Sequence, residues 1–501
     1  MVAVVVVFTG DLRLHDNPVL HAALESGRRE SGRREVVPLF VRDPAIADGP
    51  FGAPNRLALL ADCLADLDAG LRERGGRLVV RSGAFTEQVC RVAAEARAEE
   101  VHIAAGASGY AARRERLLRE ALAAERRRLV VHSGVTTAVP PGLITPGGAS
   151  TSAPAGAVAG AGGAAGDRAA HFAVFTPYHR HWSRKTLRRP LGAPRKVRVP
   201  ERIASEELPD RAALAGVSPG LGRGGERAAR ERLSSWLSHG LAGYGDPDAA
   251  ELAGASASRL STFLHFGALS ATETVHRVRA AADSDPALGP AAEAFARQLC
   301  RRDFHHQVLA ARPDAAHADY RPRGDAWRAG RAAEADAAAW REGRTGYPVV
   351  DAAMRQLREE GWIPDRARML CASFLTKTLY LDWRIGARHF LDLLADGDLA
   401  NNQLNWQWVA GTGTDTRSNR VLNPVLQARR HDPDGAYVRR WVPELAAVPG
   451  RAVHEPWRLA DDARPADYPA PVVDLAEGLA RFRAARAAAG AGAGARAAGA
   501  A

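Results

Sequence analysis

Short apolar runs alternate with longer segments of helical periodicity over the first 135 residues. The runs are rich in β-branched side chains and lie at residues 2–8, 36–41, 78–81, 101–105 and 129–132. Each has the length of a strand, and the segments between them place apolar residues at the spacing of amphipathic helices. Because strands that alternate with helices form a parallel sheet with crossover helices, the pattern predicts an α/β domain over residues 1–135.

The pattern changes after this first unit. Residues 140 to about 170 consist largely of Gly, Ala, Ser and Pro, a composition that cannot bury enough apolar surface to order itself. A basic stretch over residues 179–198 follows. We interpret residues 136–200 as a long connection between domains that carries a flexible insert.

Strand signals vanish after about residue 201, where helical periodicity and most of the ten tryptophans are found. This predicts an all-α domain over residues 201–480. The final residues are mostly Gly, Ala and Arg, and we expect residues 481–501 to form a disordered tail. A chain of 501 residues exceeds the usual size of a single core, so the length also favours two domains.

The sequence also indicates the cellular compartment and argues against disulfide or metal chemistry. The first apolar run is far shorter than the roughly 20 residues of a membrane-spanning helix, and no basic region precedes it as in a signal peptide. The four cysteines form no C-x-x-C pair, so neither a disulfide framework nor a metal site is expected. We therefore expect a cytoplasmic protein without a membrane partner.

The charge and the first loop add two weaker indications. A net charge of +11 and a pI near 10.0 favour a polyanionic partner such as nucleic acid, although much of this excess is arginine in an alanine-rich chain. The first apolar run leads into Thr9-Gly10-Asp11, without the G-x-G-x-x-G fingerprint of dinucleotide-binding folds. The crevice beyond the strand ends stays a candidate ligand site.

Six segments, taken in order, resemble the signatures of the DNA photolyase/cryptochrome family. They are residues 11–17, 258–267, 302–304, 346–357, 366–377 and 396–415. Any one segment could arise by chance, whereas the ordered set is specific and extends over nearly the whole chain apart from the insert and the tail. The chain is most similar to the class I cyclobutane pyrimidine dimer photolyases, because the segment at Trp362 lacks the histidine-rich form of the (6-4)-photoproduct branch.

The resemblance implies a noncovalently bound FAD in the helical domain. Its expected contacts are Tyr244, Ala257, Ser258, Arg259, Leu260, Ser261, Arg302, Arg368, Asp396, Gly397, Asp398 and Asn402. The Ser258 and Ser261 hydroxyls at a helix start form an anion site suited to a diphosphate, although this tetrapeptide by itself is more often a helix N-cap. By resemblance, Tyr244 and Arg302 also hold the phosphates, and Ala257 stands where the family commonly has a hydroxyl.

Asp396 and Asp398 form a second element of this expected site. They are two residues apart in a glycine-containing turn, and they should repel each other unless a cation or hydrogen-bond donors meet them. The resemblance places this loop against the edge of the flavin ring, with Arg368 as the ion-pair partner of Asp396. It also places Asn402 opposite the flavin N5.

The resemblance further implies an electron relay of oxidisable indoles. Trp406 corresponds to the flavin-proximal member and Trp383 to the middle one. We assign Trp327 as the outer member, which requires a short insertion before Trp340. Each tryptophan taken singly is more often a core residue, so this assignment depends on the family pattern.

The residues expected to face a DNA lesion are Gln298, Arg301, Asp365, Arg366, Met369, Trp408 and Gln427. This side departs from the family, because Arg301 stands where tryptophan is normal and Pro364-Asp365 stand where His-Asn is usual. A lost indole removes stacking worth roughly 1–3 kcal/mol per base, but arginine also stacks on π-faces and contacts phosphate. Asp365 weakens DNA binding unless an arginine such as Arg366 neutralises it, so we expect weakened or altered lesion binding.

The activity that the resemblance implies is light-driven repair of cyclobutane pyrimidine dimers in DNA. Reduced FAD, excited directly or through an antenna pigment in the N-terminal domain, passes an electron to a dimer flipped out of the duplex. Whether the antenna is a folate, a deazaflavin or another flavin is left open, and we expect a monomer. A cryptochrome-like photoreceptor or repair-deficient relative is the first alternative, and a noncatalytic nucleic-acid-binding module is the second.

Overall fold

The computed structural model describes residues 3–26, 35–147, 170–245, 252, 254, 256–414 and 419–498. All five expected strands are present, and they pair in parallel as one sheet in the order β3-β2-β1-β4-β5. They are β1 (Ala3–Val7), β2 (Glu35–Arg42), β3 (Val79–Ser82), β4 (Glu100–Ala104) and β5 (Arg128–His132). This order puts the topological switch point between β1 and β4, where open α/β sheets bind ligands.

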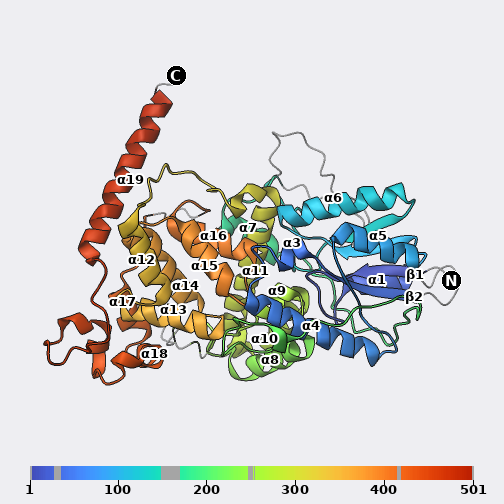
Figure 1. The fold of residues 1–501 in the computed structure, drawn as a ribbon, viewed down its shortest axis with the longest axis horizontal. Helices are drawn as coiled ribbons and strands as arrows, with labels where there is room; N and C mark the ends of the chain where they lie inside the picture. Colours follow the sequence, from blue (N-terminus) through green and yellow to red (C-terminus); the bar gives the residue numbers. More distant parts are fainter. Residues whose placement is uncertain are drawn as a thin grey trace.

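Helices cover both faces of the sheet (Figure 1). They are α1 (Pro18–Ser26), α3 (Pro44–Ala47), α4 (Pro54–Arg72), α5 (Phe85–Glu95) and α6 (Gly109–Ala124). Val5 and Val7 of β1 share a core with α5 and α6, while Val4 and Val6 share one with α1 and α4. Because both faces are covered, every residue of β1 is buried, which explains its continuously apolar sequence.

The rest of the described chain contains helices and no strand, which confirms the α/β plus all-α fold class. The helices are α7 (Phe175–Ser183), α8 (Glu226–His239), α9 (Ser261–Phe266), α10 (Ala271–Ser284), α11 (Gly289–Ala311), α12 (Arg331–Glu342), α13 (Pro348–Glu360), α14 (Asp365–Ser373), the π-helix η4 (Phe374–Thr378), α15 (Trp383–Leu393), α16 (Leu399–Ala410), α17 (Pro424–His431), α18 (Ala436–Trp441) and α19 (Leu475–Ala498). Helix α16 contacts α11, α14 and α15, so it lies at the centre of the helical half.

The connection between the halves is anchored on α11. The backbone N–H of Val139 and the indole N–H of Trp182 both donate to Oδ2 of Asp303, each at 2.9 Å. Most of the glycine- and alanine-rich insert expected between these two anchors lies outside the described residues. The buried Asp303 carboxylate therefore holds the two described ends of the connection against the helical half.

The two halves also pack closely at the first loop. The N–H of Leu12 donates to the carbonyl of Phe266 at 3.1 Å, and the Arg13 guanidinium donates to the carbonyl of Gly267 at 2.9 Å. Gly267 has a φ of +63°, and a Cβ there would lie 2.0 Å from the carbonyl oxygen of Gly10. Only glycine fits this conformation and this close approach.

The expectation of a disordered tail over residues 481–501 is wrong for residues 481–498, because α19 continues through Ala498, and the last three residues lie outside the described ranges. Phe482 is buried, and Arg486 donates to the carbonyl of Ala410 and pairs with Asp325 at 3.1 Å. The composition misled because alanine and arginine are strong helix formers once an apolar face docks. Helix α19 packs against η4 near its start and projects from the helical half toward its end (Figure 1).

The structure also bears on the cysteines and on the question of a membrane-spanning helix. All four cysteines are free, and burial raises the pKa of the Cys63 thiol to about 12. Within the described ranges, none of the helices has both the length and the apolar character needed to span a bilayer.

Docking of α19 should be measurable through Phe482. Phe482→Ala removes a buried aromatic ring and should lower the free energy of unfolding by about 3 kcal/mol, as for other large-to-small core changes. Denaturant unfolding followed by circular dichroism measures the loss. The neighbouring exposed Arg483→Ala should change the value by less than about 0.5 kcal/mol, and equal effects of the two substitutions would show that α19 is not docked.

Candidate functional site

The loop that carries Asp396 is held by the ion pair expected from the sequence. Nη2 of Arg368 donates to both carboxylate oxygens of Asp396, at 2.8 and 3.1 Å, and Nε donates to the carbonyl of Ile363 at 3.0 Å. Burial alone would lower the pKa of Arg368, but the Asp396 carboxylate raises it above its ordinary value. The arginine is therefore a permanent positive charge at this position.

Asp398 is met by a different side chain, His306, which the sequence did not reveal. Nε2 of His306 lies 2.8 Å from Oδ2 of Asp398, whose other oxygen accepts from the N–H of Asn401 and so caps α16. Burial would raise the pKa of Asp398, but the charge and hydrogen bond of His306 hold it well below its ordinary range. The two neighbouring carboxylates are thus each met by a separate basic side chain.

Gly397 lets this turn pack against the sheet domain. A Cβ at Gly397 would lie 2.6 Å from Nη1 of Arg56, a residue of α4. The Arg56 guanidinium itself donates to the carbonyls of Leu391 and Leu394, just before the turn. The acidic loop is therefore positioned by contacts from both halves of the chain.

Two histidines lie near this loop, the half-buried His265 and the buried His305, and no sequence signal marked them. His265 on α9 lies within electrostatic range of Asp398, Asp396 and Arg302. Burial, the largest cause, lowers the pKa of His265 to about 4, and that of His305 likewise. Both rings are neutral at physiological pH.

The residues at this centre fit a bound polar cofactor. Nδ1 of His306 is buried and has no hydrogen-bond partner among the described residues. Such an unpaired buried group is costly unless something meets it. Asn402, which is only 9% exposed, directs its amide N–H groups to the carbonyl of Ala387 and to Gln403, at 3.0 Å each.

The segment expected to bind phosphate begins α9. The N–H of Leu260 donates to the Ser258 hydroxyl at 3.3 Å, and Ser261 is the first residue of the helix. Arg232, which the sequence did not single out, donates to the carbonyls of Ala257 and Ser258 at 2.9 and 2.8 Å. It therefore holds this segment in place from α8.

Arg259 does not direct its charge toward the other expected flavin contacts. Its backbone has a φ of +55°, its guanidinium lies 4.2 Å from the centre of the Trp362 ring, and it pairs with Glu360 at 3.0 Å. At this turn, only the backbone N–H of Arg259 remains to bind an anion, because its guanidinium is engaged by Trp362 and Glu360.

Tyr244 and Arg302 are the other two residues expected to hold the phosphates. The Tyr244 ring packs edge-on against Trp236 and Phe295, with centroids 5.6 and 5.3 Å apart. Arg302, on α11, donates to the carbonyls of Thr136 and Leu264 at 2.6 and 3.2 Å.

The tryptophans assigned to a relay run from buried to half-buried positions. Trp406 is buried on α16, and Trp383 is buried at the start of the neighbouring α15, with its indole N–H donating to Asp319 at 2.8 Å. Trp327 is half-buried, with its ring centroid 4.9 Å from that of Tyr380. Trp340 also contacts Trp406 edge-on at 6.0 Å, although the sequence suggested no role for it.

The two departures on the expected lesion side, Arg301 and Asp365, lie within electrostatic range of each other. Burial lowers the pKa of Arg301, and attraction from Asp365, at the start of α14, opposes this effect. The Arg301 guanidinium also lies 4.6 Å from the centre of the Phe175 ring. The positive charge of Arg301 is therefore partly balanced by Asp365.

The remaining expected lesion contacts occupy different depths. Gln298 is exposed on α11, and Gln427 is half-buried on α17. Met369 and Trp408 are half-buried and pack against the core of the helical half.

A second polar group lies at the carboxyl edge of the sheet. The Tyr110 hydroxyl donates to Asp43 at 2.6 Å, and Arg114 lies 4.3 Å from the centre of the Phe85 ring. Burial lowers the pKa of Arg114 and raises that of Asp11. Nε of Arg114 has no hydrogen-bond partner among the described residues, so this crevice also suits a polar ligand.

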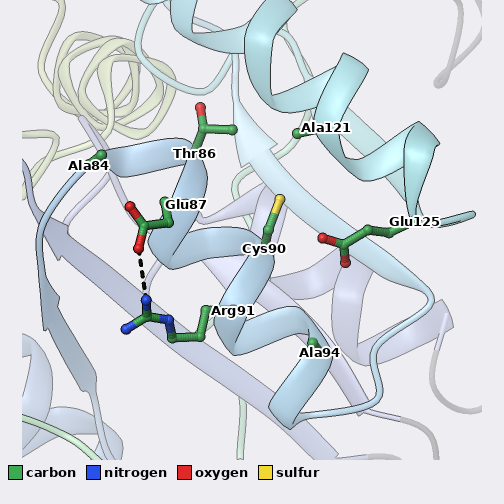
Figure 2. Close-up of a pocket in the computed structure, with 8 residues that line it drawn as sticks. All are labelled: Ala84, Thr86, Glu87, Cys90, Arg91, Ala94, Ala121 and Glu125. Carbon is green, nitrogen blue, oxygen red and sulfur yellow. Dashed lines mark hydrogen bonds and ion pairs between the residues drawn. The ribbon is translucent and has the colours of Figure 1, made fainter.

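A separate hollow of about 560 Å³ lies between α5 and α6 (Figure 2). Its lining residues are Ala84, Thr86, Glu87, Cys90, Arg91, Ala94, Ala121 and Glu125. Burial raises the pKa of Cys90, so the thiol is protonated, and Glu87 is paired with Arg91 at 2.7 Å. No residue expected to bind flavin or DNA lines it, and within the described ranges no three His, Cys, Asp or Glu side chains group as metal ligands would.

A parallel α/β domain followed by a helical domain with a buried charged centre defines the photolyase-like class of two-domain proteins. A family model described as DNA photolyase matches residues 4–196, and one described as the FAD binding domain of DNA photolyase matches residues 295–488. Deoxyribodipyrimidine photo-lyase of Streptomyces griseus is 59% identical over 488 residues, which cover 97% of this chain and 99% of that protein. The chain belongs to the DNA photolyase family.

Solved structures agree with this assignment. A bacterial class III photolyase from Agrobacterium tumefaciens has a TM-score of 0.84 at 30% identity, with 98% of each chain covered. An archaeal photolyase from Sulfolobus tokodaii, solved with two FAD molecules, has a TM-score of 0.74 at 27% identity, with 96% of this chain and 99% of that chain covered. The expected similarity to class I enzymes in particular stays a prediction.

The neutral histidines predict a pH dependence of stability. Their folded pKa of about 4 lies below the unfolded value of about 6.5, so between these values only the unfolded chain binds the protons. The free energy of unfolding should therefore fall as pH drops from about 7 to 4, by up to about 3 kcal/mol for each histidine. His265→Gln should flatten this fall in urea unfolding at a series of pH values; a slope equal to that of the parent chain would contradict the assignment.

Proposed function

We propose that this chain repairs cyclobutane pyrimidine dimers in DNA, using light and electron transfer from reduced FAD. The observation that carries the proposal is the centre at Asp396 and Asp398, with their partners Arg368 and His306, in a chain with the FAD-binding domain of DNA photolyase. The full-length similarity to a deoxyribodipyrimidine photo-lyase supports the lyase reaction.

The chain's own residues would bind and orient the cofactor. Arg302, Ser258 and Ser261 would hold the diphosphate, because they offer cationic and hydroxyl donors near the start of α9. Asp396 and Asn402 would face the flavin ring. Bound FAD supplies one electron to the lesion and takes it back, so no general acid or base has to act on the DNA.

Arg301 gives the lesion side a different platform from the tryptophan usual in the family. Its planar guanidinium rests on Phe175, and Asp365 balances its charge. Stacked arginine can contact both a base and a phosphate. Flipping a dimer out of the duplex costs a few kcal/mol, less than for an undamaged base, and Met369 and Trp408 would line the pocket that receives it.

A second chromophore would bind at the carboxyl edge of the sheet. Asp11, Asp43, Tyr110 and Arg114 supply polar groups there. The Sulfolobus tokodaii relative, with its two FAD molecules, supports such an antenna. In this organisation residues 1–135 form the antenna domain, residues 136–200 the connection, and residues from 201 through α19 the flavin domain.

The protein would act as a monomer in the cytoplasm, where it meets DNA. One copy of the chain carries the residues proposed for the flavin and those proposed for the lesion. No contribution from a second copy is needed for either group.

A cryptochrome-like photoreceptor is the second candidate function. The observation in its favour is the pair of lesion-side departures, Arg301 and Asp365. The same flavin and tryptophans would then report light to a partner without repair.

Repair is tested with a dimer-containing oligonucleotide and pre-reduced protein. Light should restore thymine absorbance, and a dark sample should not. No light-dependent recovery at saturating protein with the flavin confirmed reduced would exclude repair and favour the photoreceptor.

Binding of the same oligonucleotide tests the platform that Arg301 and Asp365 form. Arg301→Trp combined with Asp365→Asn should tighten lesion binding about 10-fold, since an indole adds stacking worth roughly 1–3 kcal/mol per base. Arg301→Lys keeps the charge without the stacking plane, so it should weaken binding. Equal lesion affinity in all three proteins would contradict the proposed platform.

The relay is tested by photoreduction. Trp406→Phe or Trp383→Phe should slow photoreduction of bound FAD at least about tenfold, equivalent to about 1.4 kcal/mol of activation free energy. Trp441→Phe, on α18, is the control and should leave the rate unchanged. If either relay variant binds FAD and photoreduces at the parental rate, the assignment is wrong.

A further inference from the structure

Tyr380 is held in an unusual conformation. Its φ of +55° is rare for a bulky residue, and the π-helix η4 ends two residues before it. Its side chain is only 2% exposed. Backbone strain of this kind persists where the surroundings enforce it, and it occurs often at functional positions.

Trp327 packs against Tyr380. Their ring centroids lie 4.9 Å apart with an interplanar angle of 42°. The backbone N–H of Arg328 donates to the carbonyl of Tyr380 at 3.1 Å, and the Arg328 guanidinium donates to the carbonyl of Leu379 at 2.7 Å. The segment that carries Trp327 is therefore clamped onto the Tyr380 backbone, and the two rings are kept in contact.

The phenol of Tyr380 has a proton acceptor in place. Its hydroxyl donates to Oδ1 of Asp325 at 3.0 Å, within the range needed for proton transfer. The Asp325 side chain is 1% exposed and pairs with Arg486 of α19 at 3.1 Å. Burial raises the pKa of Asp325, which makes its carboxylate a stronger base than an ordinary aspartate.

The C-terminal helix covers this group. Phe482 of α19 packs edge-on against Tyr380 with centroids 6.4 Å apart, on the same helix as Arg486. The docked helix therefore keeps water away from a phenol that lies beside an indole and a base.

We propose that Tyr380 is the terminal donor of the light-driven relay, with Asp325 as its proton acceptor; this inference rests on the proposed function. When photoreduction of bound flavin has withdrawn an electron through Trp406 and Trp383, the deficit reaches Trp327. Tyr380 then gives one electron to the oxidised Trp327, its O–H bond breaks, and the proton forms a new O–H bond on Asp325. Trp327 is restored, and a neutral tyrosyl radical is left.

This step makes the separated charge long-lived. Return of the electron to Tyr380 requires the proton to return from Asp325 as well. An external reductant therefore has time to complete photoreduction.

The experiment is flash photolysis of the protein with oxidised FAD, with electron paramagnetic resonance to identify the amino-acid radical. The parent chain should yield a tyrosyl radical, whereas Tyr380→Phe should yield only a tryptophan radical and shorten the charge-separated lifetime at least about 10-fold. Asp325→Asn keeps the phenol but removes the base, so it should also lower the tyrosyl yield. Tyr437→Phe, which loses a buried hydroxyl bonded to Gln356, should retain the parental signal.

A tyrosyl signal of parental size in Tyr380→Phe, or tryptophan radicals without any tyrosyl radical in the parent chain, would overturn the inference. Neither result would affect repair, because dimer repair with pre-reduced FAD does not use the relay. Tyr380→Phe should accordingly repair dimers at the parental rate in that assay. A parent chain that binds no FAD would overturn both the proposed function and this inference.

Discussion

The structure depends on two carboxylates that lie two residues apart, the buried Asp396 and the half-buried Asp398. Removing charges from water is costly, and like charges this close repel, so each carboxylate requires its own hydrogen-bonding partner. Arg368 meets one and His306 meets the other. Because these partners come from α14 and α11, the acidic loop determines how those helices approach α16. Arg56 of the sheet domain packs against the same turn, and it joins the two halves there.

Near the Asp396–Asp398 loop, desolvation determines protonation states that suit electron transfer. His265 and His305 stay neutral because their charged forms would be poorly solvated. The centre therefore contains fixed charges beside neutral rings at physiological pH. A redox cofactor held there would meet an environment that needs little reorganisation when an electron arrives or leaves, since its dipoles and charges are already in place.

The other two functional regions depend on contacts with aromatic rings. On the lesion side, Arg301 combines a cation–π contact to Phe175 with attraction to Asp365, so two departures from the family pattern form one local unit. On the opposite end of the proposed relay, Trp327, Tyr380 and Phe482 form an aromatic group covered by α19. In both places an aromatic ring packs against a functional side chain. Phe175 supports Arg301, which would contact the lesion, and Trp327 packs against Tyr380, which would donate an electron.

Local chemistry determined most of what the sequence could predict. The strands were recognisable because a sheet buried on both faces requires continuous apolar runs, and the family could be identified from ordered segments whose residues are close in sequence. Tertiary structure alone decided the rest. His306 contacts Asp398 across 92 positions, and Arg301 interacts electrostatically with Asp365 across 64. His265 differs from an ordinary histidine only in its surroundings, and α19 forms where its composition suggested disorder because Phe482 packs into a core. These features depend on long-range packing, which cannot be predicted from periodicity along the chain.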